Sequence, residues 1–343
     1  MAELAGTARP TRTAHALPTR RARRRYALTV GILAVTAIAI TVVLLAWDNP
    51  MPFGSAGFLR IAELRTTGVI VMAVVACCQG VGTVAFQTVT ENRILTPSIM
   101  GFEALYVAVQ TTAVYVLGTA GVLALQGVGQ FLLQVALMVG FALLLYGWLL
   151  SGRRGDLQVT LLVGIVIGGG LGSVSAFMQR LLTPSEFDVL SARLFGSVSN
   201  ADAALLPVAV PLAAVALVLL WSRSRRLNVV ALGRDAATAL GLRHRRELIL
   251  TLTLVSVLMA VSTALVGPLT FLGFLVATLA YQFAGTADHR YVFPVVALTG
   301  FVVLAGAYVV MKHVFDAQGV VSIIIEFVGG AVFLLILLRK GRL

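Results

Sequence analysis

Few residues of the chain have the types and spacing that chemistry requires. The two cysteines, Cys77 and Cys78, are adjacent within an apolar run, so they form neither a disulfide framework nor a ligand pair. The four histidines are spread along the chain, at His15, His244, His289 and His313. Because no His or Cys pair has the spacing of zinc ligands, we expect no protein metal site and no cofactor.

Nucleotide hydrolysis by this chain is equally unsupported. The chain has only two lysines, Lys312 and Lys340, and neither lies in a Gly-x-x-x-x-Gly-Lys-Ser/Thr phosphate loop. Neither a Ser–His–Asp set nor a His-Glu-x-x-His pair is evident in the sequence. We therefore do not expect an enzyme.

Two carboxylates lie within apolar segments. Glu103 and Glu326 each fall about one helical turn inside a predicted span, close to the membrane interface. Ionisable residues in the membrane are functional candidates, but a carboxylate near an interface also reaches the lipid headgroups, so both roles stay open. A proton- or sodium-driven carrier would more naturally have a carboxylate near the bilayer midplane, and this placement argues against one.

The elements that must position these residues are long and apolar. Of the 343 residues, 59% are hydrophobic and 12% are charged, whereas roughly 25% are charged in a soluble domain. Since a spanning helix uses about 20 residues, we expect an all-α integral membrane protein with about ten transmembrane helices. The expected spans are 26–47, 66–88, 98–117, 131–150, 157–181, 203–221, 248–266, 269–284, 292–311 and 322–338, of which the eighth is short enough to be a broken helix.

The charged residues orient these spans. The net charge is +12, and all but five of the 26 lysines and arginines fall on one side of a ten-span arrangement. Short loops rich in Lys and Arg stay in the cytoplasm, so both termini are expected there and nucleic acid is not needed as a partner. We expect a basic, disordered cytoplasmic tail at 1–25, a single transmembrane domain at 26–338 in the cell membrane, and a basic cytoplasmic tail at 339–343. The five exceptions are Arg60, Arg65, Arg180, Arg193 and Lys312.

The longest predicted cytoplasmic loop, 222–247, contains a short amphipathic helix. Gly233 precedes this helix and Gly241 follows it as a C-terminal stop. The helix either lies on the membrane surface or docks a cytoplasmic partner, and the pattern leaves both open. Its apolar residues recur at helical spacing: Leu232, Ala236, Ala239 and Leu240.

The fifth predicted span is rich in glycine, which lets helix backbones approach closely. The glycines suit either tight packing within one bundle or a seam along a pore or a dimer. They are Gly164, Gly168, Gly169, Gly170 and Gly172.

Three segments together resemble the permease subunits of ATP-binding-cassette (ABC) importers for iron-siderophore complexes, vitamin B12 and haem. The first is the loop helix, where Leu232-Gly233, Ala236-Ala237 and Leu240-Gly241 match the coupling-helix motif of that family. The others run from Gly267-Pro268 through Phe271 and Gly273 to Asp288-His289-Arg290, and from Phe86-Gln87 to Gly101. The resemblance covers roughly 60–338, and the motifs occur in the family's order on a ten-span topology.

The resemblance implies a type II ABC importer permease fold that works with other chains. The implied partners are a second permease, identical or paralogous, two cytoplasmic ATP-binding subunits and an extracytoplasmic substrate-binding lipoprotein. The implied substrate is a ferric siderophore complex. Vitamin B12 or haem is the alternative, and a proton-coupled secondary transporter is a more distant one.

The family also implies roles for individual residues. Those for coupling to the ATPase lie in cytoplasmic coupling helices near 228–243, and they are Leu232, Gly233, Arg234, Asp235, Ala236, Ala237, Leu240 and Gly241. Those for docking of the binding protein are Arg60, Arg65 and Lys312. Those at a pathway or helix break are Gly267, Pro268, Phe271 and Gly273.

Two departures from the family pattern weaken the substrate assignment. Ala277-Thr278 replaces the usual Pro-His, and Arg65 alone represents the Arg-Leu-Pro-Arg run at the start of the second span. Segments 87–97 and 326–330 look more like a sub-branch that serves ferric siderophores, especially catecholates. The family is therefore more firmly indicated than the siderophore.

Overall fold

The computed structural model describes residues 16–124, 126–149, 157–198, 201–314 and 321–340, and within these ranges the regular structure is entirely helical. Eight of its helices are long and apolar enough to cross a membrane, and two further apolar helices are shorter. The expectation of an all-α membrane protein with about ten apolar helices is confirmed.

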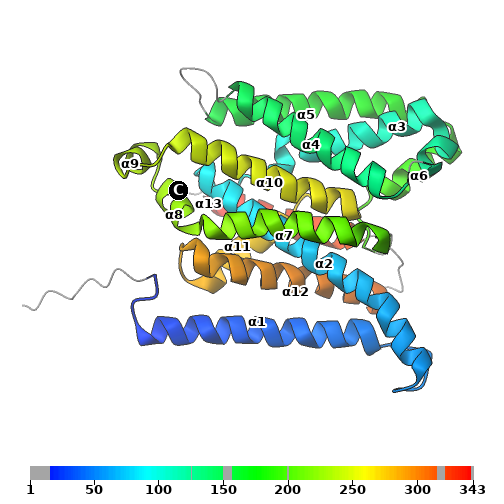
Figure 1. The fold of residues 1–343 in the computed structure, drawn as a ribbon, viewed down its shortest axis with the longest axis horizontal. Coiled ribbons are helices and arrows are strands. Elements are labelled where there is room, and N and C mark those ends of the chain that lie inside the picture. The colour runs from blue at the N-terminus through cyan, green and yellow to red at the C-terminus, as the bar shows by residue number, and fades with distance from the viewer. Residues whose placement is uncertain (1–15, 125, 150–156, 199–200, 315–320, 341–343) are drawn as a thin grey trace, which may run out of the picture.

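The helices follow the expected spans closely (Figure 1). The long ones are α1 (Arg20–Ala46), α2 (Ala56–Val89), α3 (Phe102–Ala124), α4 (Val128–Leu149), α5 (Leu157–Gln179), α7 (Leu206–Ser222), α10 (His244–Val266) and α12 (His289–Val314). The two with shorter apolar stretches are α11 (Leu272–Ala284) and α13 (Val321–Lys340), whose apolar part is Val321–Ile336. Three short helices and two 3-10 turns complete the fold: α6 (Pro184–Leu194), α8 (Ser224–Val230), α9 (Arg234–Ala239), η1 (Pro97–Met100) and η2 (Ala203–Leu205).

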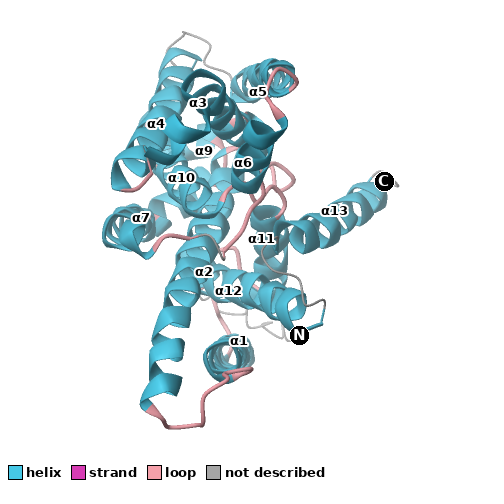
Figure 2. Cartoon of the chain, turned by 90° about the vertical axis from the view of Figure 1, so that its right-hand side faces the viewer, coloured by secondary structure: helices cyan, strands magenta, loops and turns pink. Residues whose placement is uncertain are grey.

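Helix α2 is the centre of the bundle. Its second half is almost completely buried, and α10 and α12 pack along it. Small residues make this close approach feasible, because a Cβ at Gly80 would lie 3.0 Å from Val296 and one at Gly300 would lie 3.0 Å from the carbonyl oxygen of Ala76. By contrast, α13 is directed away from the other helices (Figure 2).

The bundle has two ends, named here for the short helices that lie there (Figure 1). The α9 end contains the start of α1 and the end of α13, so the first and last described residues lie at the same end. The α6 end contains the α1–α2 and α3–α4 connections. The start of α2, the turn after α5, the end of α6 and the end of α12 lie at the α6 end (Figure 1), and these segments carry Arg60, Arg65, Arg180, Arg193 and Lys312. The other described lysines and arginines belong to segments at the α9 end.

Several chain segments break inside the bundle and meet there. Helix α11 has 13 residues, so it is about 20 Å long and does not cross a hydrocarbon core of about 30 Å. The Ser197 amide donates to the Val266 carbonyl at 2.8 Å, and the Ser322 amide donates to the Gly196 carbonyl at 3.3 Å. We call these meeting segments, 98–103, 195–198, 266–271 and the start of α13, the broken-helix layer.

Several boundaries differ from the expected ones; α3, for example, ends at Ala124 rather than at 117. Helix α1 begins at Arg20, so the last arginines of the expected tail are helical, and α2 begins at Ala56 rather than at 66. No helix is predicted from the sequence at α6, because its residues form no long apolar run. Its sequence signal is a capping box, in which Thr183 and Glu186 bond to each other's backbone amides, with Pro184 in the first turn.

Candidate functional site

The predicted loop helix is present as α9, and glycines fix both of its ends. Gly233, with a φ of 93°, precedes it, and Gly241, with a φ of 82°, follows it. Both are left-handed conformations that L side chains rarely adopt. The turn after α9 closes through the Leu242 amide, which donates to the Ala237 carbonyl at 3.0 Å.

Two exposed leucines flank α9, one before its first residue and one after its last. Ala237 is fully buried against the bundle, whereas Leu232 and Leu240 are 62% and 64% exposed. Arg234 and Asp235 are exposed beside them. The structure therefore turns the leucines of the amphipathic pattern away from the rest of the chain, where they are free to contact another surface.

A hydrogen-bonded cluster ties α8 to α2 and α12. Asn228 on α8 donates to an Asp288 carboxylate oxygen at 2.9 Å and accepts from the His289 amide at 3.0 Å. The His289 ring contacts Asn228 Oδ1 through Nδ1 at 2.5 Å and Thr88 Oγ1 through Nε2 at 2.7 Å. Three elements distant in sequence are thus joined through one imidazole.

Asp288 is held ionised at the centre of this cluster. Burial alone would raise the pKa of its carboxyl, but hydrogen bonds from Arg290 and Asn228 lower that pKa to about 2. Arg290 also forms an ion pair with it at 2.6 Å. The charged acceptor is therefore present throughout the physiological pH range.

A second charged cluster holds the ends of α7, α8 and α10. Glu247 on α10 is buried and pairs with Arg223 at the α7–α8 junction. It also pairs with the more exposed Arg226 on α8 at 3.1 Å. Burying a carboxylate is costly unless cations and donors surround it, so this pair fixes where α8 leaves the bundle.

A cavity of about 350 Å³ lies between the α8–α9 turn and the end of α2. Its walls include Gly233, Gln87 and His289. The Arg93 guanidinium stacks over the Tyr281 ring at 4.5 Å from the ring centre, which is a cation–π contact. The segment from Phe86 to Arg93 is part of the third segment that resembles the family. In the fold it lies beside the turn that leads into α9.

The predicted helix-break residues lie in or beside the broken-helix layer. Gly267 has a φ of 88°, and a Cβ there would lie 3.3 Å from the Arg193 carbonyl oxygen. A Cβ on Gly273 would collide with the Thr83 hydroxyl. The Pro268 carbonyl packs on Gly196, and Phe271 packs on Gly329 of α13.

Glu103 also belongs to the broken-helix layer. Its Oε2 accepts a hydrogen bond of 2.6 Å from the Thr270 hydroxyl, so it joins α3 to the α10–α11 turn. Its Oε1 is buried without a hydrogen-bond partner among the described residues. Glu326, on α13, is exposed and close enough to interact with it electrostatically.

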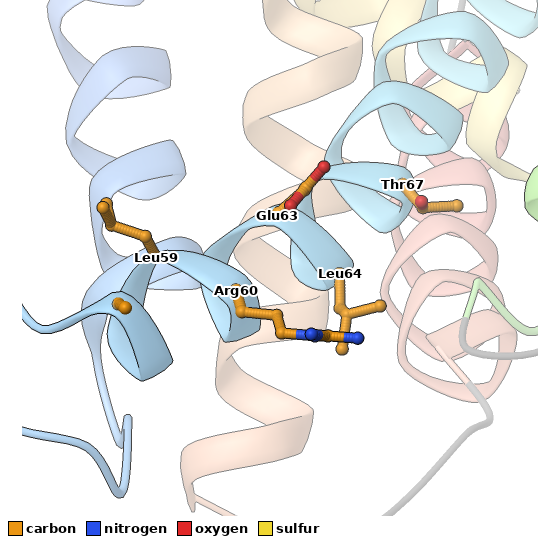
Figure 3. Close-up of a pocket in the computed structure, with 6 residues that line it drawn as sticks. Leu59, Arg60, Glu63, Leu64 and Thr67 are labelled. Carbon is orange, nitrogen blue, oxygen red and sulfur yellow. The ribbon is translucent and has the colours of Figure 1, made fainter.

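The structure separates the three predicted docking residues into two places at the α6 end. Arg65 donates to the carbonyls of Trp47 at 2.6 Å and Asp48 at 2.8 Å, which anchors the α1–α2 connection. Lys312 is near enough to Arg65 and Asp48 to interact electrostatically with both. Arg60 instead points from α2 into a surface cavity of about 600 Å³, on the same side as Leu64 (Figure 3).

Comparison with known proteins identifies the family. The model of the FecCD transport family matches residues 25–339. The chain belongs to the FecCD transport family. This FecCD protein is 49% identical over 332 residues to the petrobactin import system permease protein FatC of Bacillus anthracis, covering 97% of this chain and 94% of the relative. It is 34% identical to the petrobactin import system permease protein YclO of Bacillus subtilis (strain 168), covering 94% and 99%.

A solved structure supports the fold of this FecCD protein. A metal-chelate type ABC transporter in an inward-facing conformation superimposes with a TM-score of 0.79, covering 90% of this chain and 98% of that chain at 18% sequence identity. The expected type II importer permease fold is confirmed, and the protein is a multi-pass protein of the cell membrane. Within the part of the chain that the structure describes, no group of three His, Cys, Asp or Glu residues is arranged to hold a metal ion.

Proposed function

We propose that this chain is the transmembrane permease subunit of an ABC importer that carries a ferric siderophore complex into the cytoplasm. The observation that carries the proposal is the near full-length similarity, at 49% identity, to a permease named for petrobactin import. ATP hydrolysis belongs to two separate cytoplasmic subunits, since this chain has no phosphate loop. An extracytoplasmic binding lipoprotein delivers the substrate.

The α9 end faces the cytoplasm in this proposal. It holds most of the described arginines. Short loops rich in Lys and Arg are retained on the cytoplasmic side of a membrane. Both chain termini are then cytoplasmic, and the α6 end with Arg60 and Lys312 faces outward.

Helix α9 receives the motion of the ATPase. Leu232 and Leu240 are exposed and can enter a partner's groove. Gly233 and Gly241 shape the turns, and Arg234 and Asp235 set the charge beside them. A displacement of α8 and α9 reaches α2 and α12 through Asn228 and His289, and the two halves of the pathway open alternately.

A second permease completes the pathway. Gly169 and Gly170 on α5 are exposed, and nothing lies within 4 Å of a Cβ at either position. The exposed apolar face of α13 includes Phe327 and Leu334. We assign these two faces to the contact with the second permease, and we assign Gly267, Pro268, Phe271 and Gly273 to the helix break beside the pathway.

The outward basic residues steer the binding protein. Arg60 and Lys312 supply positive charge that meets acidic groups on the lipoprotein, which mainly speeds and orients docking. Arg65 contributes by holding the α1–α2 connection, because its guanidinium donates to the carbonyls of Trp47 and Asp48. Fewer of its N–H groups are then available to the binding protein.

Uptake by the reconstituted importer tests the proposal. We would incorporate this chain with its second permease and ATPase subunits into vesicles and measure binding-protein-dependent uptake of ferric petrobactin, vitamin B12 and haem. We expect ATP-dependent uptake of the ferric siderophore. Uptake that needs a proton gradient and ignores ATP would overturn the proposal, and preferential uptake of vitamin B12 or haem would overturn the substrate class.

Variants at α9 test the coupling role in the same vesicles. Asp235→Arg and Gly241→Trp should reduce copurification with the ATPase and ATP-driven uptake. Glu186→Arg, at the α6 end, is the control for a charge reversal and should leave copurification unchanged. Normal copurification and uptake by both α9 variants would remove this helix from the coupling site.

A further inference from the structure

A polar cavity at the α6 end, which Gly267 also lines, is assigned no step in the function proposed above. Its volume is about 440 Å³, and residues of α3, α4, α6, α10 and η2 line it. Small-molecule sites commonly have volumes of about 300–1,000 Å³, so the cavity has the size of a ligand site. Its apolar wall includes Phe131, Leu205 and Leu265.

The polar wall is a chain of side chains that begins at Arg193. The Arg193 Nη1 donates to Gln110 Oε1 at 3.4 Å, and Gln110 Nε2 donates to Gln134 Oε1 at 3.4 Å. Both bonds are long and therefore weak. This series of hydrogen bonds ends at Gln134 Nε2, which is buried and has no hydrogen-bond partner among the described residues.

Arg193 lacks an anionic partner. Its Nη2 makes only a 3.5 Å contact with the Val122 carbonyl, and no ion pair forms with it in the described ranges. Burial lowers the pKa of its guanidinium, which Tyr106 partly offsets. A half-buried cation without a counter-charge is costly, and a bound anion would relieve that cost.

The remaining polar groups favour an acceptor ligand. Ser197 lines the cavity, and its buried hydroxyl has no partner in the part of the chain that the structure describes. Asp202 is the one carboxylate among the described lining residues. It is exposed, and its Oδ1 accepts from the Ala204 amide at 2.8 Å to cap η2.

We propose that this cavity binds a small carboxylate-bearing molecule, with the Arg193 guanidinium supplying the charge and Gln134 and Ser197 supplying further donors. A guanidinium matches a carboxylate in two parallel hydrogen bonds, which a planar fork provides and a lysine does not. The site lies within one chain, and it does not depend on which chelate the importer carries.

Calorimetric titration of the purified full-length protein in detergent tests the site. Citrate is the probe, and phosphate and the uncharged polyol sorbitol are the comparison ligands. We expect saturable citrate binding that raises the thermal unfolding midpoint, as any ligand of the folded state does. Arg193→Gln should weaken citrate binding at least tenfold, and Asp202→Asn should tighten it severalfold because it removes the negative charge on the wall.

Arg180→Gln is the matched control, because it removes an equal charge at the same end but outside the cavity, and it should leave citrate affinity unchanged. If Arg193→Gln does not fold, Asp202→Asn and the charge-preserving Arg193→Lys still decide the outcome. Unchanged citrate affinity in both of these variants would overturn the proposal. So would an absence of citrate binding, or binding of phosphate or sorbitol as tight as that of citrate.

Discussion

The two ends of the bundle are held together in different ways. At the α9 end, Asn228, Asp288 and His289 form short contacts that join helices far apart in the sequence. At the α6 end, Arg193 makes only bonds of 3.4 and 3.5 Å, and a polar cavity remains between the helices. The cluster around Asn228 is therefore more tightly bonded than the one around Arg193, although each end contains a cavity.

This difference fits the tasks proposed for the two ends. A segment that receives force must pass displacement to its neighbours, and a connected cluster with two arrangements can do so. The α6 end instead keeps room and polar groups with unused hydrogen-bonding capacity, which the proposed carboxylate site requires. The variants below therefore come in pairs, one at each end.

The largest effect is expected from Glu247→Ala. Arg223 then loses the carboxylate that neutralises it, and removing one partner of a buried pair costs about 3 kcal/mol. The midpoint of chemical unfolding in detergent measures the loss.

The counterpart at the α6 end is Glu186→Ala. Glu186 caps α6 together with Thr183 but is exposed to solvent at that end. We expect a much smaller shift of the midpoint. Equal shifts for the two glutamates would contradict the claim that the α9 end is the more tightly constrained one.

Asn228→Ala should have the next largest effect. It removes the hydrogen bonds to Asp288 and from His289, and a net loss of about 2 kcal/mol is expected because buried partners are left unsatisfied. Uptake per ATP hydrolysed should fall further than stability does, since α8 is no longer tied to α2 and α12.

Asn49→Ala is the matched variant at the α6 end. Asn49 donates to the Phe58 carbonyl at 3.2 Å and accepts from the Met51 amide at 3.1 Å. Its loss should lower stability without changing uptake per ATP. The same fall in that ratio for both asparagines would show that the α9 cluster has no special part in coupling.

The helices could be predicted from the sequence, but the contacts between them could not. Apolar runs predicted ten helices because a bilayer requires long apolar segments, and Gly233 and Gly241 predicted the ends of α9 because few residues adopt a positive φ. No local pattern predicts that Thr88 meets His289, since the two are 201 positions apart. Only the packing of α12 on α2 brings them together.

The cavity at the α6 end was hidden from the sequence for the same reason. Gln110, Gln134 and Arg193 come from three helices, and each residue alone looks like an isolated polar side chain. Helix α6, which carries Arg193, has a visible capping signal at Thr183 and Glu186. This capping box predicts a helix, but it does not predict the cavity beside that helix.

Gly233→Ala should have a moderate effect on stability. The residue has a φ of 93° and a ψ of 167°, a region essentially restricted to glycine, so an L side chain there costs about 1–3 kcal/mol. Gly54→Ala, with a φ of 80° in the α1–α2 connection, should cost a similar amount. Only the first variant should reduce copurification with the ATPase, and an equal reduction by both would remove the turn before α9 from the docking surface.

The smallest effect concerns acid stability. The pKa of Asp288 is about 2 in the folded protein, whereas its ordinary value is 3.8. Ionisation of this carboxyl therefore stabilises the folded state relative to the unfolded state. This contribution is fully present above about pH 4 and is lost as the pH falls toward 2. The thermal unfolding midpoint should therefore drop over that range, and Asp288→Asn should flatten the drop. Asp235→Asn, an exposed change on α9, should keep the full drop. If the unfolding midpoint of Asp288→Asn fell with pH as much as that of the unchanged protein, this carboxylate would not hold the α8–α12 contact. The contrast between the two ends would then rest on Glu247 and Asn228 alone.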